Sequence, residues 1–383
     1  MSEARHSRRL ASSLLAASLA SALWGLGSAR AAVRDAWDDA ERVVAVGDVH
    51  GDLAQLETVL RDASVIDGKE RWVGGRTHLV QVGDRLDRAP DSRKVMDLLM
   101  RLEKEARKAG GAVHPLIGNH EAMNVLGDLR YTTPAEFAAF RTPDSSRLRD
   151  ALFSRFVEER RAQRLPSLTD AERRAWEDAH PPGFVEQRLA LSPKGTYGAW
   201  ICGLNAVIRI GDTLFLHGGI SPKYAGFSLG DLNERIRQEL READPLTAVI
   251  TSDPDGPLWF RGLAQGDPAL AGPLETVLKR HGCRRMVIGH TPTEGLVMPL
   301  YGGRVVVIDV GLSRFFGGPP AALILEDGKA FALHRGRKLA LPESEGEGLV
   351  RYVREVMALE PDPSRLRALL DRLEGVSAAA PPP

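Results

Sequence analysis

Three short polar fragments, each directly after an apolar run, constrain the fold more than any other feature of this chain. The fragments read GDVHG, GDRLDR and GNHE, and they follow apolar runs at residues 43–46, 78–82 and 113–117. Apolar runs of this length bounded by Gly are typical of buried parallel strands. The spacing between the fragments leaves room for a strand, a turn, a helix and a return, which is the size of a βαβ unit. The sequence therefore predicts an α/β fold that contains parallel strands.

The polar fragments are expected to meet at one edge of the sheet, because ligands of open α/β sheets bind outside the carboxyl ends of the strands. Two further histidines follow apolar runs in the same way: His217 comes after residues 213–216, and His290 after residues 286–288. A two-metal site needs hard oxygen and imidazole ligands, one carboxylate able to bridge, and open positions for a water and a phosphate oxygen. The fragments supply such ligands, and they indicate a two-metal site.

The five motifs resemble those of the calcineurin-like metallophosphoesterases, and among these the phosphoprotein phosphatases, whose motifs read GDxHG, GDxxDRG, GNHE, HGG and GHT. All five occur here in that order, and the resemblance covers about residues 42–334. The phrases MNVLGDLRY, GPLWFRG and IDVGLS are similar to the Shewanella-like branch of this family. Ala89 stands where most relatives have the last Gly of GDxxDRG. Since Gly usually serves the backbone there, Ala89 puts the local turn in question.

The resemblance implies an α/β sandwich of two mixed β-sheets flanked by helices. Its catalytic domain is expected at residues 40–340, with a helical insertion at 122–200 that could act as a lid, a specificity element or a buttress. Residues 341–383 are expected to form a C-terminal helical extension and a disordered Pro-rich tail. Two β-hairpins, at 206–216 and 321–334, are expected to contribute to the second sheet.

Helix signals fill the insertion and the extension. Residues 146–164 read as one helix, a shorter helix opens at Pro134, and Thr169 with Glu172 reads as an N-terminal cap followed by an acidic first turn. Further helices are predicted at 348–359 and 364–373.

The resemblance also implies a ligand set for two divalent metal ions, with Mn²⁺ expected and Fe or Zn as alternatives. The first ion would be held by Asp48, His50 and Asp84. The second would be held by Asp84, Asn119, His217 and His290. Two ions about 3.5–4 Å apart acidify a bridging water, which can attack phosphorus in line without a covalent phosphoenzyme.

Four other residues of the motifs carry separate expectations. Arg88 and Arg261 suit a bidentate grip on phosphate oxygens, because guanidinium presents a planar fork that matches them. His120 would donate a proton to the leaving group and would be oriented by Asp87, as in the Asp-His pair of the family. Four further histidines are read as ordinary surface or strand residues: His78, His114, His281 and His334.

The first 31 residues read as a cleaved signal peptide. Arg5, Arg8 and Arg9 precede a charge-free stretch at residues 10–27, and Ala29-Arg30-Ala31 follows in the A-x-A style of a signal peptidase site. An uncleaved anchor is disfavoured, because the stretch is rich in Ala and Ser and short for a membrane span. We expect an exported protein, periplasmic or secreted, and the adjacent arginines leave both the Sec and the twin-arginine routes open.

Composition gives no sign of a nucleic-acid or membrane partner. Lys and Arg number 51, as do Asp and Glu, so no net charge attracts the chain to nucleic acid or anionic lipid. Cys202 and Cys283 could pair in an oxidising compartment, but their separation in sequence leaves this open.

The expected function is metal-dependent hydrolysis of phosphomonoesters in phosphoproteins, including phosphotyrosine, or in a small phosphate ester. A nucleotide or dinucleoside-polyphosphate hydrolase with the same metals is an alternative, which GNHE rather than GNHD disfavours. A non-catalytic binding module is a third reading, and the presence of every ligand disfavours it. The sequence leaves open the natural substrate, the choice between Ser/Thr and Tyr, and the oligomeric state.

Overall fold

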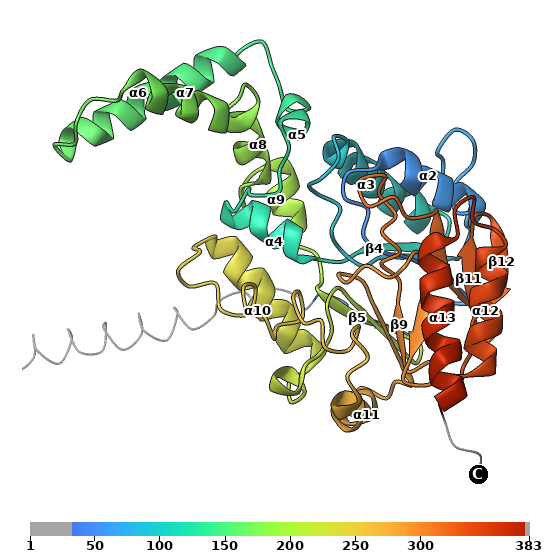
Figure 1. Ribbon diagram of the computed structural model, residues 1–383. Coiled ribbons are helices and arrows are strands. Elements are labelled where there is room, and N and C mark those ends of the chain that lie inside the picture. The colour runs from blue at the N-terminus through green and yellow to red at the C-terminus, as the bar shows by residue number, and fades with distance from the viewer. Residues whose placement is uncertain (1–32, 380–383) are drawn as a thin grey trace, which may run out of the picture. The chain divides into compact units, whose positions relative to one another are not determined.

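Two six-stranded mixed sheets form the centre of the structure, which is a computed structural model that describes residues 33–379 (Figure 1). The strands of the first sheet are, in order, β12 (Arg337–Ala340), β11 (Lys329–His334), β10 (Ala321–Glu326), β2 (Arg42–Val46), β3 (His78–Gln81) and β4 (Ala112–Pro115). Those of the second are β1 (Ala36–Trp37), β5 (Val207–Ile210), β6 (Thr213–Leu216), β7 (Arg285–Ile288), β9 (Val305–Val307) and β8 (Met298–Leu300). The predicted pair of mixed sheets flanked by helices is confirmed.

The three strands that precede the polar fragments are parallel neighbours. β2 pairs with β3, and β3 with β4, in parallel register. The helix α2 (Leu53–Asp62) connects the first two strands and α3 (Ser92–Lys108) the next two, as a βαβ unit requires. In the second sheet β6, β7 and β9 are also parallel, so His217 and His290 likewise follow the carboxyl ends of neighbouring strands. The apolar residues of both sheets contribute to one hydrophobic cluster.

Both predicted hairpins form, but one of them lies in a different sheet from the one expected. β5 and β6 pair antiparallel around Gly211-Asp212, and β10 and β11 pair around Asp327-Gly328. β10 pairs with β2, which places the second hairpin beside the parallel strands of the first sheet. Turn residues predict that two strands pair with each other, and they carry no information on which further strand joins them.

Helices fill the segment between the GNHE and HGG motifs. They are α4 (Asn119–Leu126), α5 (Pro134–Ala138), α6 (Ser145–Ala162), α7 (Asp170–Ala179), α8 (Phe184–Leu191) and α9 (Thr196–Ile201). Thr169 and Glu172 form the expected capping box of α7. The antiparallel pair α6 and α7, in green in Figure 1, is held together by the Trp176 ring, which lies 4.9 Å from the Phe153 ring and 5.9 Å from that of Phe156.

Helices also follow the HGG motif and close the described part of the chain. They are η2 (Pro222–Tyr224), α10 (Leu229–Glu242), η3 (Pro268–Leu270), α11 (Ala271–Arg280), α12 (Glu347–Met357) and α13 (Ser364–Ala379). α12 and α13, in red in Figure 1, pack on each other, and α12 also contacts β12. The signal peptide prediction lies outside the described residues. Across residues 33–379, no helix is both long and apolar enough to cross a membrane.

Of the four histidines expected to be ordinary surface or strand residues, three lie on strands and are buried: His78, His114 and His334. Ring nitrogens of His114 and His78 are 3.1 Å apart, and His334 Nε2 lies 2.5 Å from a Glu360 carboxylate oxygen. Each of these side chains meets a polar partner inside the fold, which periodicity alone does not predict, whereas His334 Nδ1 has no hydrogen-bond partner among the described residues. Both cysteines carry free thiols.

Candidate metal centre and acid pair

The turns after the strands bring the polar fragments together at the cost of an unfavourable backbone. His50, Asp84 and His290 have positive φ angles of 44°, 56° and 66°. Non-glycine residues seldom adopt this conformation, and such strain tends to concentrate at functional sites. Gly47 is required for a different reason: a Cβ there would lie 2.2 Å from the Ile308 carbonyl oxygen. The two sheets thus approach each other closely where the fragments end.

All six predicted metal ligands are buried and lie in one cluster. His217 Nε2 lies 3.2 Å from an Asp84 carboxylate oxygen and 2.9 Å from Asn119 Oδ1. His50 Nε2 lies 3.7 Å from the other Asp84 oxygen and 4.0 Å from Asp48. Two triads could each hold an ion, with ligand atoms within 4.8 Å of one another: His50, Asp84 and His120, and Asp84, His217 and His290. Asp84 belongs to both.

Hydrogen bonds to the backbone fix which nitrogen of each imidazole faces the cluster. Nδ1 of His50 lies 3.0 Å from the Leu86 carbonyl oxygen, and Nδ1 of His217 lies 3.0 Å from that of Val82. Their Nε2 atoms are therefore left for the cluster. In His290 it is Nε2 that lies 3.0 Å from a carbonyl oxygen, that of Trp259, which leaves Nδ1. Ligating histidines are commonly oriented in this way.

The charges of the cluster favour a cation. Burial raises the pKa of Asp48 well above its ordinary value, and the carboxylates of Asp309 and Asp84 raise it further. Burial lowers the pKa of His50 to about 4 and, together with His217, that of His290 to about 2. No Lys or Arg among residues 33–379 forms an ion pair with Asp48 or Asp84. Carboxylate, amide and neutral imidazole groups suit divalent ions, so the donor set fits two of them.

Several supporting residues lie inside the quoted motifs but carried no predicted role. The buried Glu121 carboxylate accepts 2.8 Å hydrogen bonds from the backbone amides of Gly118, Asp84 and Arg85. It thereby ties the start of α4 to the turn that carries the shared ligand. Asp309 faces Asp48, and burial raises its pKa to about 6. Glu121 and Asp309 are recognised by their burial and by the polar groups around them. A single sequence reveals neither property.

His120 and Asp87 form a buried pair beside this cluster. His120 Nδ1 lies 2.6 Å from Asp87 Oδ2, and its Nε2 lies 3.7 Å from an Asp84 oxygen. Burial lowers the pKa of His120, but Asp84 and Asp87 outweigh burial and raise it to about 9. Because Nδ1 faces the Asp87 carboxylate, the imidazole presents Nε2 to the cluster.

The turn that carries Arg88 forms without Gly at position 89. Positive φ angles fall on Asp87 and Arg88, at 68° and 74°, whereas Ala89 does not have one. The concern about Ala89 is therefore not supported, because the strained positions precede it. The Arg88 guanidinium lies 4.0 Å from the centre of the Tyr131 ring and 5.3 Å from that of Phe315.

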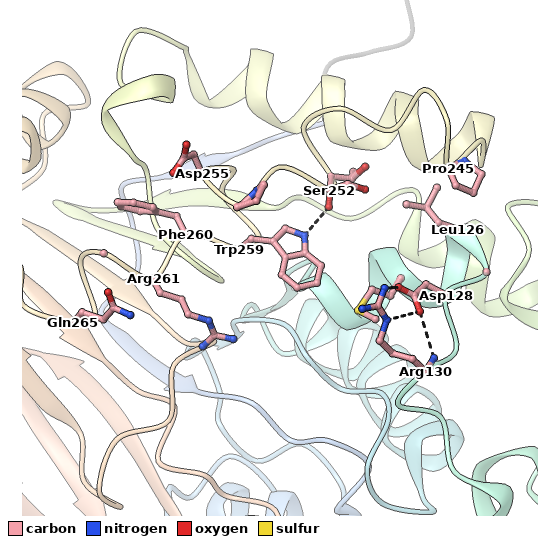
Figure 2. A pocket seen from close by; sticks show the side chains of 15 residues that line it. Leu126, Asp128, Arg130, Pro245, Ser252, Asp255, Trp259, Phe260, Arg261 and Gln265 are labelled. Carbon is pink, nitrogen blue, oxygen red and sulfur yellow. Dashed lines mark hydrogen bonds and ion pairs between the residues drawn. The ribbon is translucent and has the colours of Figure 1, made fainter.

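Arg261 links the cluster to a neighbouring cleft of about 900 Å³ (Figure 2). Its Nη1 donates to the His290 carbonyl oxygen at 2.6 Å and to Thr291 Oγ1 at 3.1 Å. Trp259 also belongs to both places, since its carbonyl contacts His290 while its ring lines the cleft. Arg130, which pairs with Asp128, lines the cleft as well. A bound group at the cluster could thus extend into the cleft.

Comparisons with known proteins agree with this geometry. The sequence profile described as calcineurin-like phosphoesterase matches residues 41–294. Shewanella-like protein phosphatase 2 of Arabidopsis thaliana is 29% identical over 294 residues, which are 72% of either chain. Shewanella-like protein phosphatase 1 of Plasmodium berghei is 25% identical over 306 residues, 76% of this chain and 74% of that one. The solved structure of a cold-active protein-tyrosine phosphatase of a psychrophilic Shewanella species is 27% identical, with a TM-score of 0.62 over 81% of this chain and 82% of that one.

Proposed function

This chain belongs to the calcineurin-like phosphoesterase family, and we propose that it is a metal-dependent protein phosphatase, a hydrolase of phosphoric monoesters. One observation carries the proposal most: Asp84 is common to two groups of potential ligands, and His120, which belongs to one of these groups, also pairs with Asp87. A shared carboxylate suits a binuclear centre, and an adjacent protonated imidazole suits expulsion of a leaving group.

The proposed ligands of one metal ion are Asp48, His50 and Asp84. Those of the other are Asp84, Asn119, His217 and His290. When bound, two divalent ions supply Lewis-acid chemistry and charge neutralisation for phosphoryl transfer. Carboxylate and imidazole ligands are compatible with Mn²⁺, which we propose, and with Fe or Zn. Metal analysis of the purified protein distinguishes these ions.

The proton donor and the phosphate clamp are assigned to residues around the cluster. His120 holds a proton on Nε2 for the departing alkoxide or phenoxide, while Asp87 accepts the hydrogen bond from Nδ1. Arg88 and Arg261 present guanidinium groups to phosphate oxygens. Stacking on the Tyr131 ring limits the positions open to the Arg88 guanidinium. For Arg261 to bind phosphate, its hydrogen bonds to His290 and Thr291 must be kept or exchanged.

We propose phosphorylated protein, and phosphotyrosine in particular, as the substrate. The cleft beside Arg261 has room for residues that flank a phosphorylated side chain, which favours a peptide over a small ester. Aromatic rings lie beside two histidines of the site: the Tyr131 ring is 5.1 Å from that of His120, and the Phe316 ring is 5.3 Å from that of His50. The similar Shewanella structures are named protein tyrosine phosphatases.

A substrate panel tests the proposal. Phosphotyrosyl peptides, phosphoseryl peptides and nucleotides are compared with added Mn²⁺ and with a chelator. We expect phosphate release from phosphotyrosyl peptides at least equal to that from phosphoseryl peptides, and loss of both with the chelator. A clear preference for phosphoseryl or phosphothreonyl peptides would overturn the tyrosine proposal, and a preference for nucleotides would overturn the protein phosphatase proposal.

A further inference from the structure

Helix α8 of the insertion reaches the acid pair through two amide side chains. Gln187, on α8, is 2% exposed, and its Nε2 donates to Asn124 Oδ1 at 3.0 Å. Asn124, on α4, presents its Nδ2 to both oxygens of Asp87, at 3.1 and 3.2 Å. Asp87 in turn contacts His120 at 2.6 Å. Four buried side chains thus form a continuous chain of hydrogen bonds from the insertion to the proton donor.

The carboxylate fixes the polarity of this chain. Ionised Asp87 only accepts hydrogen bonds, so Asn124 must turn its NH₂ group towards it. The Asn124 oxygen is then left facing α8, and Gln187 must in turn present its own NH₂ group. Gln187 Oε1 has no hydrogen-bond partner among the described residues, so this amide serves as a donor in the structure.

The surrounding contacts hold α8 against α4 and α6. The Arg188 guanidinium donates to the backbone oxygen of Asn124. Glu186 accepts hydrogen bonds from Thr142 and from Ser145, at the start of α6. α8 begins after Gly183, where a Cβ would lie 1.9 Å from the Phe137 oxygen, so the helix start is closely packed on α5. The position of Gln187 is therefore well defined.

Resting on the function proposed above, we propose that Gln187 is a positioning residue for proton donation. Its amide holds the Asn124 amide in the one orientation that donates to Asp87, and Asp87 thereby keeps His120 aligned with the leaving group. The helical insertion accordingly acts as a buttress of the acid pair. Thr132 Oγ1 also donates to Asp87, at 2.8 Å, so loss of Gln187 weakens the alignment without abolishing it.

Two substitutions at Gln187 separate this role from packing. Gln187→Glu keeps the size of the side chain but sets a carboxylate oxygen against Asn124 Oδ1. Rotation of the Asn124 amide relieves this repulsion and turns its oxygen towards Asp87. Gln187→Met removes the donor without introducing a repulsion, so its effect is smaller. Gln163→Glu and Gln163→Met, at an exposed position of the same insertion, are the matched controls.

The measurement is kcat on an alkyl ester, phosphoserine, divided by kcat on p-nitrophenyl phosphate, whose leaving group scarcely needs a proton. We expect Gln187→Glu to lower this ratio about tenfold, as loss of an orienting partner commonly does. Gln187→Met should lower it by a smaller factor, with KM near wild type in both. The controls should leave the ratio unchanged. In a His120→Asn background, Gln187→Glu should no longer change the ratio, because the group it orients is absent.

Thermal melting and metal content identify variants that fail to fold, and Gln187→Met decides the test if Gln187→Glu is one of them. Equal losses on the two esters, unchanged ratios in the folded variants, or an undiminished effect in the His120→Asn background would each overturn the role of Gln187. A wild-type protein that hydrolyses neither ester would instead refute the proposed function, and this inference with it. The two failures are therefore distinguishable.

Discussion

Single hydrogen bonds decide what each side chain of the candidate site can do. His50 and His217 are each turned by a backbone carbonyl at Nδ1, and His290 is turned the opposite way by a carbonyl at Nε2. His120 differs from them, because its Nδ1 meets a carboxylate and its pKa is raised to about 9. These differences agree with the proposed roles, in which three of the four imidazoles are metal ligands and the fourth, His120, is the proton donor.

Replacement of His120 tests its role as proton donor. General acid catalysis is typically worth about 10²–10⁴-fold, and it matters most when the leaving group is poor. We expect His120→Asn to slow phosphoserine hydrolysis by about that factor and to slow p-nitrophenyl phosphate hydrolysis far less. Metal content, measured by elemental analysis, should stay near that of the wild type. Equal losses on both esters, or a lost metal ion, would assign this residue a different role.

At the scale of elements, apolar runs with flanking Gly were the most informative signal. The expected runs at 43–46 and 213–216 correspond closely to β2 and to β6. The strands β1, β8 and β9 were not predicted, because two or three residues give too little periodicity. β12 was not predicted because its four residues are largely exposed and do not form an apolar run. The motifs identified the ligand candidates, whereas Gln187 carries no motif and became visible only through its contacts.

One contact between elements gives a pH prediction. Buried His334 on β11 meets Glu360, which follows α12 and also pairs with Arg335. Burial lowers the pKa of His334 below its ordinary 6.5. Burial would raise the pKa of Glu360, but Arg335 and His334 hold it below its ordinary 4.5. For both groups the unfolded chain binds the proton more tightly, so stability should fall as pH drops below 6.5 and fall further below 4.5.

Melting temperatures between neutral and acidic pH test this prediction. Glu360→Gln should be less stable than the wild type at neutral pH and should show a shallower loss below about pH 4.5, where Glu360 itself binds a proton. Glu345→Gln, at an exposed position, should keep the wild-type profile. A Glu360→Gln protein that loses stability below about pH 4.5 as steeply as the wild type would refute the contribution of this contact.

The fold of the whole molecule was predictable because the parallel strands are apolar runs, each followed by a recognisable polar motif. We propose that the catalytic domain spans residues 40–340, that a C-terminal extension follows from residue 341, and that the protein is exported to the periplasm or the medium. The insertion could be located from its helix signals, but its contact with the acid pair could not be predicted. That contact joins Gln187 and Asn124, which lie 63 positions apart.

Removal of the predicted signal peptide can be tested by measuring the mass of the mature protein. The charge-free stretch at residues 10–27 and the Ala29-Arg30-Ala31 that follows it predict cleavage after Ala31. Protein recovered from a native host should therefore begin near Ala32, as intact-mass measurement or N-terminal sequencing would report. Recovery of the full stretch in the membrane fraction would contradict a cleaved signal.

We propose that Asp84 would be a ligand of both metal ions in a phosphatase centre. Removing a carboxylate between two cations leaves them repelling each other, so Asp84→Asn should cost more than Asp48→Asn, which changes a ligand of one ion. The direct measurement is a titration of metal-free protein with Mn²⁺ that follows bound ions and phosphate release from a phosphotyrosyl peptide. We predict two ions per chain and metal-dependent turnover in the wild type, and neither in Asp84→Asn. Turnover by the metal-free protein would contradict a metal-dependent phosphatase, and two tightly held ions in Asp84→Asn would contradict the role of Asp84 as a shared ligand.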